Sequence, residues 1–520
     1  MTDIADQPST KTLAIRGVLF NWIGRGCSFV ITFFLTPFLL HTLGDARYGV
    51  WSIIMGLTSY YGLADAGLRG AGTKHIAEAH ALGDHDRIQR IIVTSFAMYI
   101  GLSLTVLIVA SVIALLYPYL FETGPVSLTT IQYVILLVAA NFGLRLMSQP
   151  FAATLAALTR FDLQNALSVS SQLLQAGLIV LALSFADGLL AMAWAMLAVG
   201  VVGAIGHFWM AQVALGGFSM SPRHFDRQTL DEQFSFGSGL LAIGSMERIA
   251  EASGPLIVGA FAGPAAAGYY SIANQLTQKT ERLTRGISTV LMPVSSRLTA
   301  EKRNNDLKKI VLFVPRCMFA VSMLSTVIFV FLGAPFLRTW LGAEYVETVY
   351  PLLCVLTIAG SLLKVSGGVA SLLTGMGLLR FQAIVRAVRL VLTIGGGLLL
   401  TPFFGGLGMA WAQLAGFGFT GISQAWFIAR HLELPISAQL QSTCVRGGGS
   451  LIPAAILAIL LPRVWAPTTL PVVMTQIVAV AVVAAGGLLL ICIPVDHRRS
   501  IIAALMPKPR QRKTPQPVTR

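Results

Sequence analysis

Long uninterrupted runs of apolar residues constrain this chain more than any other feature of its sequence. The runs are about twenty residues or more long, as in Ile91–Tyr117, Leu189–Val213 and Pro471–Ile493, and short polar breaks separate them. An α-helix of about twenty residues crosses the ~30 Å hydrocarbon core of a bilayer. Only 11% of the 520 residues are charged, against roughly 25% in a soluble domain. We therefore predict an all-α polytopic membrane protein with about fourteen transmembrane helices, the first at Gly17–Leu40.

The distribution of basic residues between these runs predicts the orientation of the chain. Cytoplasmic loops of membrane proteins carry an excess of Lys and Arg. With the N-terminus inside, the inner segments hold 23 such residues and the outer loops hold three, Arg47, Arg338 and Arg463. We therefore predict that the terminal segments 1–16 and 494–520 are both cytoplasmic. The net charge of +15 then suits contact with anionic membrane lipids, and we expect no nucleic-acid partner.

An internal repeat divides the chain into two similar parts. The segment Gly44–Ile53 recurs in outline as Gly263–Ile272, at an offset of 219, and two further pairs of segments match at offsets of 220 and 217. Parallel repeats of this kind place a substrate site at their interface. The predicted organisation is a first six-helix bundle at 17–213, a cytoplasmic linker at 214–235, a second six-helix bundle at 236–429, and two extra transmembrane helices at 447–493.

Several short motifs resemble a known family. The stretches Leu43–Trp51 and Tyr60–Leu68 are similar to the opening signature of bacterial polysaccharide-biosynthesis flippases of the Wzx kind. Gly263–Ala273 and Trp340–Gly342 resemble the same family in the second half. These flippases belong to the MOP superfamily, which also contains MATE exporters and the lipid II flippase MurJ. The resemblance covers roughly residues 12–430, and the order and spacing of the motifs carry it.

This resemblance implies transport rather than catalysis. It implies a flippase that moves an undecaprenyl-diphosphate-linked oligosaccharide from the cytoplasmic to the periplasmic leaflet of the bacterial inner membrane, by alternating access. The pathway would be exopolysaccharide, capsule or O-antigen synthesis, and the resemblance leaves open a partnership with polysaccharide polymerase and export machinery. No G-x-x-x-x-G-K-[ST] phosphate loop occurs in the sequence. We therefore expect transport that runs downhill or on an ion gradient, without a cofactor.

Basic residues inside the apolar runs point to a substrate site. Eleven Lys and Arg residues lie within the predicted spans against four Asp and Glu, an excess of seven positive charges. Each of these basic residues costs about 2.5–3.5 kcal/mol when it faces lipid. In the eighth predicted span, 268–294, polar residues form one stripe at helical spacing. We predict a cationic cavity that binds a diphosphate, although hydrogen bonds between helices are an alternative explanation of the stripe. The predicted cavity residues are Arg25, Arg145, Arg248, Lys279, Arg282, Arg285, Gln275 and Gln278.

Carboxylates in the spans are few, and they are candidates for coupling transport to an ion. Burial raises carboxyl pKa values toward the working range, which favours Asp65, Glu247 and Glu251 in this role. Local ion pairs are the alternative, of Asp65 with Arg69 and of Arg248 with Glu247 or Glu251. Four basic residues near expected cytoplasmic helix ends are explained by snorkelling, namely Arg69, Arg316, Arg386 and Arg389.

Two other functions compete with a flippase. MATE exporters typically depend on a carboxylate in the first span, whereas Gly17–Leu40 has none and carries Arg25, which argues against an ion-coupled multidrug exporter. A membrane glycosyltransferase or polymerase would need a sizeable catalytic loop, and the longest outer loops have about a dozen residues. We expect no catalytic residues. Histidines five apart on a helix, such as His75 and His80, cannot share a zinc ion, and we expect no metal site.

Overall fold

The described part of the chain is helical throughout. The computed structural model describes residues 10–62, 68–185 and 188–492; within them, the side chains at 10–23, 25, 234–244 and 281–290 are not described. No strand occurs among the described residues, and eleven of their helical segments are long and apolar enough to cross a membrane. A helix satisfies its backbone hydrogen bonds internally, as a hydrocarbon environment requires. The predicted all-α polytopic membrane fold is thereby confirmed.

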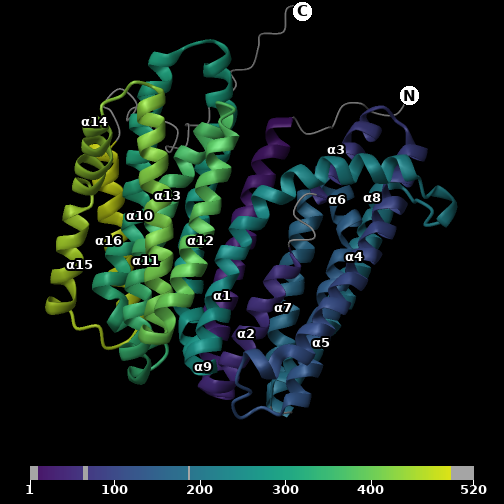
Figure 1. Cartoon of the computed structure of the whole chain (residues 1–520), viewed down its shortest axis with the longest axis horizontal. Coiled ribbons are helices and arrows are strands. Elements are labelled where there is room, and N and C mark those ends of the chain that lie inside the picture. Colours follow the sequence, from purple (N-terminus) through teal and green to yellow (C-terminus); the bar gives the residue numbers. More distant parts are fainter. Residues whose placement is uncertain (1–9, 63–67, 186–187, 493–520) are drawn as a thin grey trace, which may run out of the picture. The chain divides into compact units, whose positions relative to one another are not determined.

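The helices follow one another with short connections (Figure 1). Their bounds in the first part of the chain are α1 Thr10–Leu43, α2 Asp45–Tyr61, α3 Leu68–Ala81, α4 His85–Leu120, α5 Leu128–Met147, α6 Gln149–Ala157, α7 Phe161–Phe185 and α8 Leu189–Leu215. Those in the second part are α9 Arg227–Ala300, α10 Asn304–Trp340, α11 Val346–Gly375, α12 Leu379–Phe404, α13 Gly406–His431, α14 Ile436–Leu440, α15 Ile452–Val464 and α16 Leu470–Gly487. Short helical turns η1 to η4 lie at Pro222–His224, Ala343–Tyr345, Gln441–Gly447 and Leu488–Cys492.

The number of spans is fourteen by prediction and eleven by the length and composition of the described helices. The predicted spans 49–71 and 405–429 fall largely on α2 and α13, which are helical but are not among the eleven. The predicted spans 236–262 and 268–294 both fall on α9, of which one segment, Ser245–Thr280, is among the eleven. The count of fourteen therefore stays a prediction.

A glycine at the start of each copy of the repeated motif sets the direction of the following helix. Gly263 interrupts α9 with φ 82° and ψ 172°, which divides the helix into two arms at 227–262 and 264–300. Gly44, at the equivalent position of the first repeat, precedes α2 with φ 76° and ψ 164°. Only glycine adopts this backbone conformation without strain. The two copies of the repeated motif thus have the same backbone geometry, and α2 corresponds to the second arm of α9.

The chain divides into two compact units that are not the two sequence repeats. Unit 1 consists of 1–279, 340–360 and 379–420, and unit 2 of 280–339, 361–378 and 421–520. The division passes through α9, α11 and α13, so each of these helices contributes to both units. The two units are described separately below.

In unit 1, small residues let helices α4, α5 and α8 pack closely. Helix α5 packs against both α4 and α8, and α7 packs against α1 and α8. A Cβ atom at Gly143 of α5 would lie 3.4 Å from the Ser103 Cβ of α4, and one at Gly200 of α8 would lie 2.1 Å from the Asn141 Oδ1 of α5. Close backbone approach through small residues is the usual basis of helix association in membranes.

The two copies of the repeated motif are also in direct contact in unit 1. A Cβ atom at Gly49 in α2 would lie 1.8 Å from the carbonyl oxygen of Pro264, and one at Gly268 would lie 3.3 Å from the Gly49 Cα. Gly49 and Gly268 occupy equivalent positions of the two repeats. We refer to Gly49, Pro264 and Gly268 as the repeat junction.

In unit 2, the last two long helices pack on α10. Leu332 of α10 forms one buried cluster with residues of α15 and α16, including Ala454, Ala458 and Val480. Elsewhere in the unit, the buried Lys364 of α11 donates hydrogen bonds to Thr280 Oγ1 at 3.0 Å and to Ser325 Oγ at 3.2 Å. The hydroxyls hold this cation among helices and away from lipid.

Candidate functional site

A polar pocket in unit 1 is the candidate functional site. It has a volume of about 280 Å³ and is formed by α1, α2 and the two arms of α9. Most of its polar atoms belong to hydroxyl and amide groups, which is uncommon so far inside apolar helices. The lining residues are Thr32, Leu35, Thr36 and Leu39 of α1; Tyr48, Trp51, Ser52, Met55, Gly56 and Ser59 of α2; Glu251, Ala252 and Pro255 of the first arm of α9; and Ser271, Asn274, Gln275 and Gln278 of the second arm.

The lining follows the internal repeat position by position. Six residues of the first repeat have a lining counterpart in the second repeat at the offset of 219. The pairs are Thr32 and Glu251, Thr36 and Pro255, Ser52 and Ser271, Met55 and Asn274, Gly56 and Gln275, and Ser59 and Gln278. The pocket therefore lies where equivalent faces of the two repeats meet, directly beside the repeat junction.

The two faces have equivalent positions but different chemistry. On the face from the first repeat, Thr32, Thr36, Ser52 and Ser59 present short hydroxyls, Tyr48 and Trp51 present rings, and Gly56 has no side chain at all. On the face from the second repeat, Asn274, Gln275 and Gln278 present amides, and Glu251 presents a carboxylate. An amide both donates and accepts hydrogen bonds, and a carboxylate accepts them. The first face leaves room at Gly56, and the second supplies all the amides and the carboxylate.

One buried hydroxyl in the pocket has no protein partner among the described residues. Ser271 is 6% exposed, and its Oγ makes no hydrogen bond with them. A buried polar atom without a partner costs free energy, of the order of 1–3 kcal/mol. This Oγ has almost no accessible surface in the present conformation, so a ligand or water reaches it only after a shift of the pocket wall. Gln275, one turn further along α9, is exposed.

A cation lies at the edge of the pocket. Lys279 Nζ donates a hydrogen bond to Thr32 Oγ1 at 3.0 Å, which links the second arm of α9 to α1. Lys279 also lines a small neighbouring cavity together with Gln275, Phe33 and Trp340. The Trp340 Nε1 donates to the Phe33 carbonyl oxygen at 2.9 Å and holds this wall in place. Thr32 is therefore shared between the pocket and the cation.

The structure brings together some of the predicted site residues and leaves others apart. Gln275, Gln278 and Glu251 line the pocket and Lys279 lies at its edge. Arg145 and Arg248 are exposed and are not among the lining residues. Three predicted cavity residues, Arg25, Arg282 and Arg285, have side chains outside the described residues, as does the whole of Asp65. The predicted cationic cavity thus remains a prediction.

Glu247 and Arg248, neighbours in sequence, have different partners. The Arg248 Nη1 donates to the carbonyl oxygen of Gly62. Glu247 Oε1 lies 3.7 Å from Arg389 Nη1, and the Arg389 side chain is 3% exposed and stacks over the Phe417 ring at 5.1 Å. Glu247 therefore pairs with a residue far away in sequence, which local spacing could not reveal.

Snorkelling is the wrong explanation for two of the four residues to which the sequence analysis applied it. Arg389 is 2% exposed and Arg316 is 8% exposed, so both side chains are covered by other parts of the protein and do not lie along its surface. Arg389 has a carboxylate partner in Glu247, and Arg316 donates to the backbone carbonyl of Cys492. Burial with a partner is the other way in which a membrane helix accommodates a charge.

A polar contact near the start of α2 joins distant parts of the chain. The Asp45 carboxylate accepts a hydrogen bond from the Tyr269 hydroxyl at 2.6 Å and one from the Tyr345 hydroxyl at 2.9 Å. Both tyrosines belong to the second half of the chain, and Asp45 belongs to the first. This contact lies about one helical turn from Gly49 and joins α2 to α9 and to η2, which directly precedes α11.

The sequence contained a signal for three of the pocket residues that the prediction did not include. The polar stripe on the second arm of α9 was recognised through Ser271, Gln275 and Gln278. Moving that stripe back by the repeat offset of 219 gives Ser52, Gly56 and Ser59, which line the same pocket. Within the part of the chain that the structure describes, no group of three or more His, Cys, Asp or Glu side chains could hold a metal ion.

Comparison with known proteins identifies a matching family and solved structures with a similar fold. A family model described as "Polysaccharide biosynthesis protein" matches residues 42–350. The lipid II flippase MurJ, solved in an inward closed conformation, is similar with a TM-score of 0.66 and 13% identity, covering 94% of this chain and 100% of that chain. A multidrug resistance MATE family transporter of the MOP superfamily, solved in an inward-facing conformation, has a TM-score of 0.65 and 16% identity, covering 79% of this chain and 96% of that chain. No curated protein sequence matches.

Proposed function

The chain belongs to the polysaccharide biosynthesis protein family, and on that premise we propose that it is a membrane flippase for a lipid-linked oligosaccharide. Its substrate is an undecaprenyl-diphosphate-linked oligosaccharide, moved from the cytoplasmic to the periplasmic leaflet of a bacterial inner membrane. Both termini are cytoplasmic in this proposal. The observation that carries it is the pocket whose lining positions recur at the repeat offset. A carrier built from two parallel repeats binds its substrate where the repeats meet.

The chemistry of the pocket fits a sugar. A pyranose presents hydroxyls that donate and accept hydrogen bonds, and it has an apolar C–H face. Asn274, Gln275 and Gln278 supply amides for the hydroxyls, and the ring of Trp51 supplies an apolar wall. A volume of about 280 Å³ holds one or two sugar rings and not a whole oligosaccharide. The remainder of the substrate then lies outside this pocket.

The diphosphate is assigned to the basic residues of the spans. Lys279 lies at the pocket edge, within reach of a group attached to a sugar bound there. The other proposed anion-binding residues are Arg25, Arg145, Arg248, Arg282 and Arg285. Arg grips a diphosphate with two parallel hydrogen bonds, which a point charge cannot do.

Coupling to an ion gradient is assigned to the carboxylates Asp65, Glu247 and Glu251. Glu251 faces the pocket, so its charge changes the electrostatics of the bound substrate directly. Glu247 pairs with the buried Arg389. Protonation of Glu247 would leave the Arg389 charge without a counter-ion, a change that favours rearrangement of α9 against α12.

An ion-coupled exporter of cationic compounds is the second candidate. The observation in its favour is Glu251, a carboxylate in the pocket wall that would attract a cation. Lys279 at the pocket edge acts against it. The two candidates differ in the charge of the substrate, which a transport assay can measure.

The test is transport by the full-length chain in proteoliposomes. An undecaprenyl-diphosphate-linked glycan with a fluorescent label is incorporated in the membrane, and its exposure on each leaflet is followed with a membrane-impermeant quencher. The proposed function predicts time-dependent movement in the presence of the protein, and a lower rate in the Gln278→Ala variant. Gln172→Ala in α7, which lies outside the pocket, is the matched control. Movement of a cationic dye without movement of the glycan would favour the exporter.

A further inference from the structure

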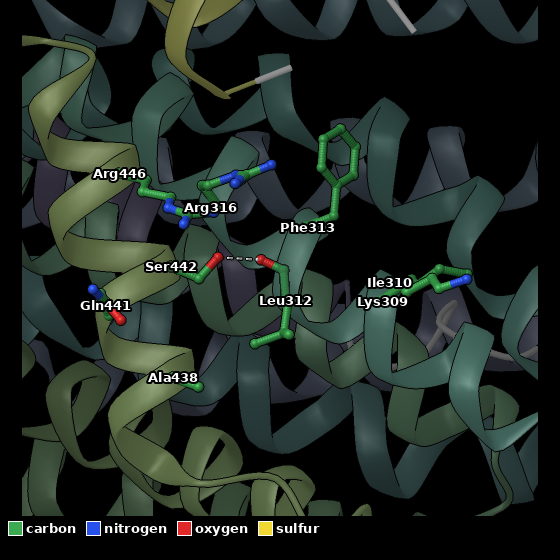
Figure 2. Close-up of a pocket in the computed structure, with 9 residues that line it drawn as sticks. All are labelled: Lys309, Ile310, Leu312, Phe313, Arg316, Ala438, Gln441, Ser442 and Arg446. Atoms are coloured by element: carbon green, nitrogen blue, oxygen red, sulfur yellow. Dashed lines mark hydrogen bonds between the residues drawn. The ribbon is translucent and has the colours of Figure 1, made fainter. Parts of the chain in front are cut away.

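A larger pocket lies in unit 2, far from the candidate site in sequence and formed by different helices. It is bounded by α10 on one side and by α14 and η3 on the other (Figure 2). Its volume of about 650 Å³ is within the ~300–1,000 Å³ range of small-molecule sites. The walls include the apolar side chains of Ile310, Leu312 and Phe313. We call this the basic pocket, because of the charges described next.

Three cations line the basic pocket, and none of the described lining residues is a carboxylate. The cations are Lys309 and Arg316 of α10 and Arg446 of η3. Figure 2 shows the Arg446 side chain extending toward that of Arg316, with Lys309 at the other end. Lys309 Nζ lies 3.4 Å from Asp306 Oδ1, but none of the ion pairs within the described residues involves Arg316 or Arg446. Two neighbouring guanidinium groups therefore share a pocket without a counter-ion from the described part of the chain.

Arg316 is the most constrained of the three. It is 8% exposed, its Nη2 donates to the Cys492 carbonyl oxygen at 2.5 Å, and its guanidinium lies 5.3 Å from the centroid of the Phe313 ring. Its Nε is buried and has no hydrogen-bond partner among the described residues. A buried cation without a counter-ion is costly, and an anion bound next to its guanidinium removes part of that cost.

The pocket is held in shape by contacts between its two walls. Ser442 Oγ donates to the Leu312 carbonyl oxygen at 2.8 Å (Figure 2). At Gly447, a Cβ atom would lie 2.9 Å from the Arg316 carbonyl oxygen, so only glycine allows η3 to approach α10 this closely. η3 is a π-helical turn, a deviation often found at functional sites. The cations are therefore positioned before any ligand arrives.

We propose that the basic pocket binds the phosphate headgroup of an anionic phospholipid. The phosphate accepts hydrogen bonds from Arg316 and Arg446, and the apolar walls contact the glycerol and the first part of the acyl chains. Basic pockets between membrane helices are typical sites for anionic headgroups. The segments around Lys309 and Arg446 are those predicted to be cytoplasmic, which places the lipid in the inner leaflet. The site does not depend on the proposed flippase function.

The proposal is tested by lipid binding to the purified full-length chain in a neutral detergent. The probe is fluorescent phosphatidylglycerol, and the competitors are unlabelled phosphatidylglycerol, phosphatidylcholine, inorganic phosphate and undecaprenyl diphosphate. We expect competition by phosphatidylglycerol and little by phosphatidylcholine or inorganic phosphate. Equal competition by phosphatidylcholine would show that headgroup charge is irrelevant and would overturn the proposal. Full competition by inorganic phosphate, or by undecaprenyl diphosphate with much higher affinity than phosphatidylglycerol, would assign the pocket to those anions instead.

Variants of the lining arginines test whether phosphatidylglycerol binds in the basic pocket. Arg446→Gln removes an exposed charge and should weaken phosphatidylglycerol binding by about fivefold to tenfold. Arg316→Gln should weaken it further, because the charge of the more buried guanidinium is lost. Arg463→Gln, an exposed charge near the other end of α15, is the matched control and should bind as the unmodified chain does. Because the Arg446 side chain is exposed, its loss does not threaten folding, and equal binding by Arg446→Gln and Arg463→Gln would refute the site.

Discussion

The two faces of the candidate pocket occupy equivalent positions in the repeats, yet they differ in chemistry. Thr32, Ser52 and Ser59 present short hydroxyls where Glu251, Ser271 and Gln278 stand in the second repeat. The backbone geometry at Gly44 and Gly263 is nearly the same, so the difference lies in side chains and not in the fold. The comparison indicates that the duplicated backbone gives the pocket its shape. Sequence divergence on one face gives that face its distinct hydrogen-bonding groups.

The largest expected effect comes from disrupting the close backbone contact at the repeat junction, which supports both faces. In Gly49→Ala, the new Cβ would lie 1.8 Å from the Pro264 carbonyl oxygen, a backbone atom that cannot move aside by rotation. We expect a loss of about 3 kcal/mol in the free energy of unfolding. The thermal unfolding midpoint in detergent and the abundance in membranes are the measurements.

The matched control for Gly49→Ala replaces a glycine that has space for a methyl group. A Cβ atom at Gly101 in α4 meets no atom within 4 Å, and Gly101→Ala should leave the unfolding midpoint unchanged or raise it slightly because alanine favours helix. If both variants unfold alike, the repeat junction is not a close contact in the folded protein.

The second effect comes from making the two faces alike at their charged position. Glu251→Thr replaces the carboxylate by the residue of the equivalent position, Thr32. Hydrogen bonds to a charged group contribute about 1.5–3 kcal/mol, so glycan transport should fall by roughly tenfold to a hundredfold. Protein abundance should stay normal, because Glu251 faces the pocket. Glu433→Gln, at an exposed position, is the control. Unchanged transport in Glu251→Thr would mean that the second face gains nothing from its charge.

A smaller effect is expected when a neutral amide is replaced by its counterpart. Gln278→Ser introduces the residue found at position 59 of the other face and removes one amide group. A neutral hydrogen bond contributes about 0.5–1.5 kcal/mol, so the transport rate should fall by about twofold to tenfold.

The reverse change, Ser59→Gln, fills the face that leaves room and should lower transport by steric exclusion. A transport rate in Ser59→Gln equal to that of the unmodified chain would contradict the assignment of space to the first face.

The smallest effect separates two serines in equivalent positions. Both Ser52 and Ser271 are buried, but Ser271 Oγ has no hydrogen-bond partner among the described residues. Ser271→Ala should raise the apparent substrate KM by about twofold, whereas Ser52→Ala should leave it unchanged. An equal response of the two variants in the proteoliposome assay would show that the free hydroxyl does not contact substrate.

The all-α fold could be predicted from the sequence because the bilayer permits few alternatives. A long apolar run must satisfy its own backbone hydrogen bonds, and so the run Leu189–Val213 predicted α8 to within a few residues of its observed ends. The polar stripe of Gln275 and Gln278 was predictable for a similar reason, since helical periodicity alone places such residues on one face.

Contacts between distant segments could not be predicted in the same way. Glu247 on α9 and Arg389 on α12 are far apart in sequence, and nothing in their neighbourhoods indicates that they pair. The sequence therefore favoured snorkelling for Arg389, and for Glu247 it left open a role in ion coupling or a local pair with Arg248. Asp45 likewise has its two tyrosine partners 224 and 300 residues away. Only the repeat offset carried long-range information, and it did so for the pocket alone.

The Asp45 contact with Tyr269 and Tyr345 determines how easily the start of α2 can separate from α9. Its two hydrogen bonds join groups that water can satisfy equally well once the contact opens, so each adds only about 1 kcal/mol to the closed form. A hydrophobic plug of similar size would lose its full burial energy on opening. We therefore expect the carboxylate and its two phenols to form a contact that breaks and re-forms within the microsecond-to-millisecond time of helix movements.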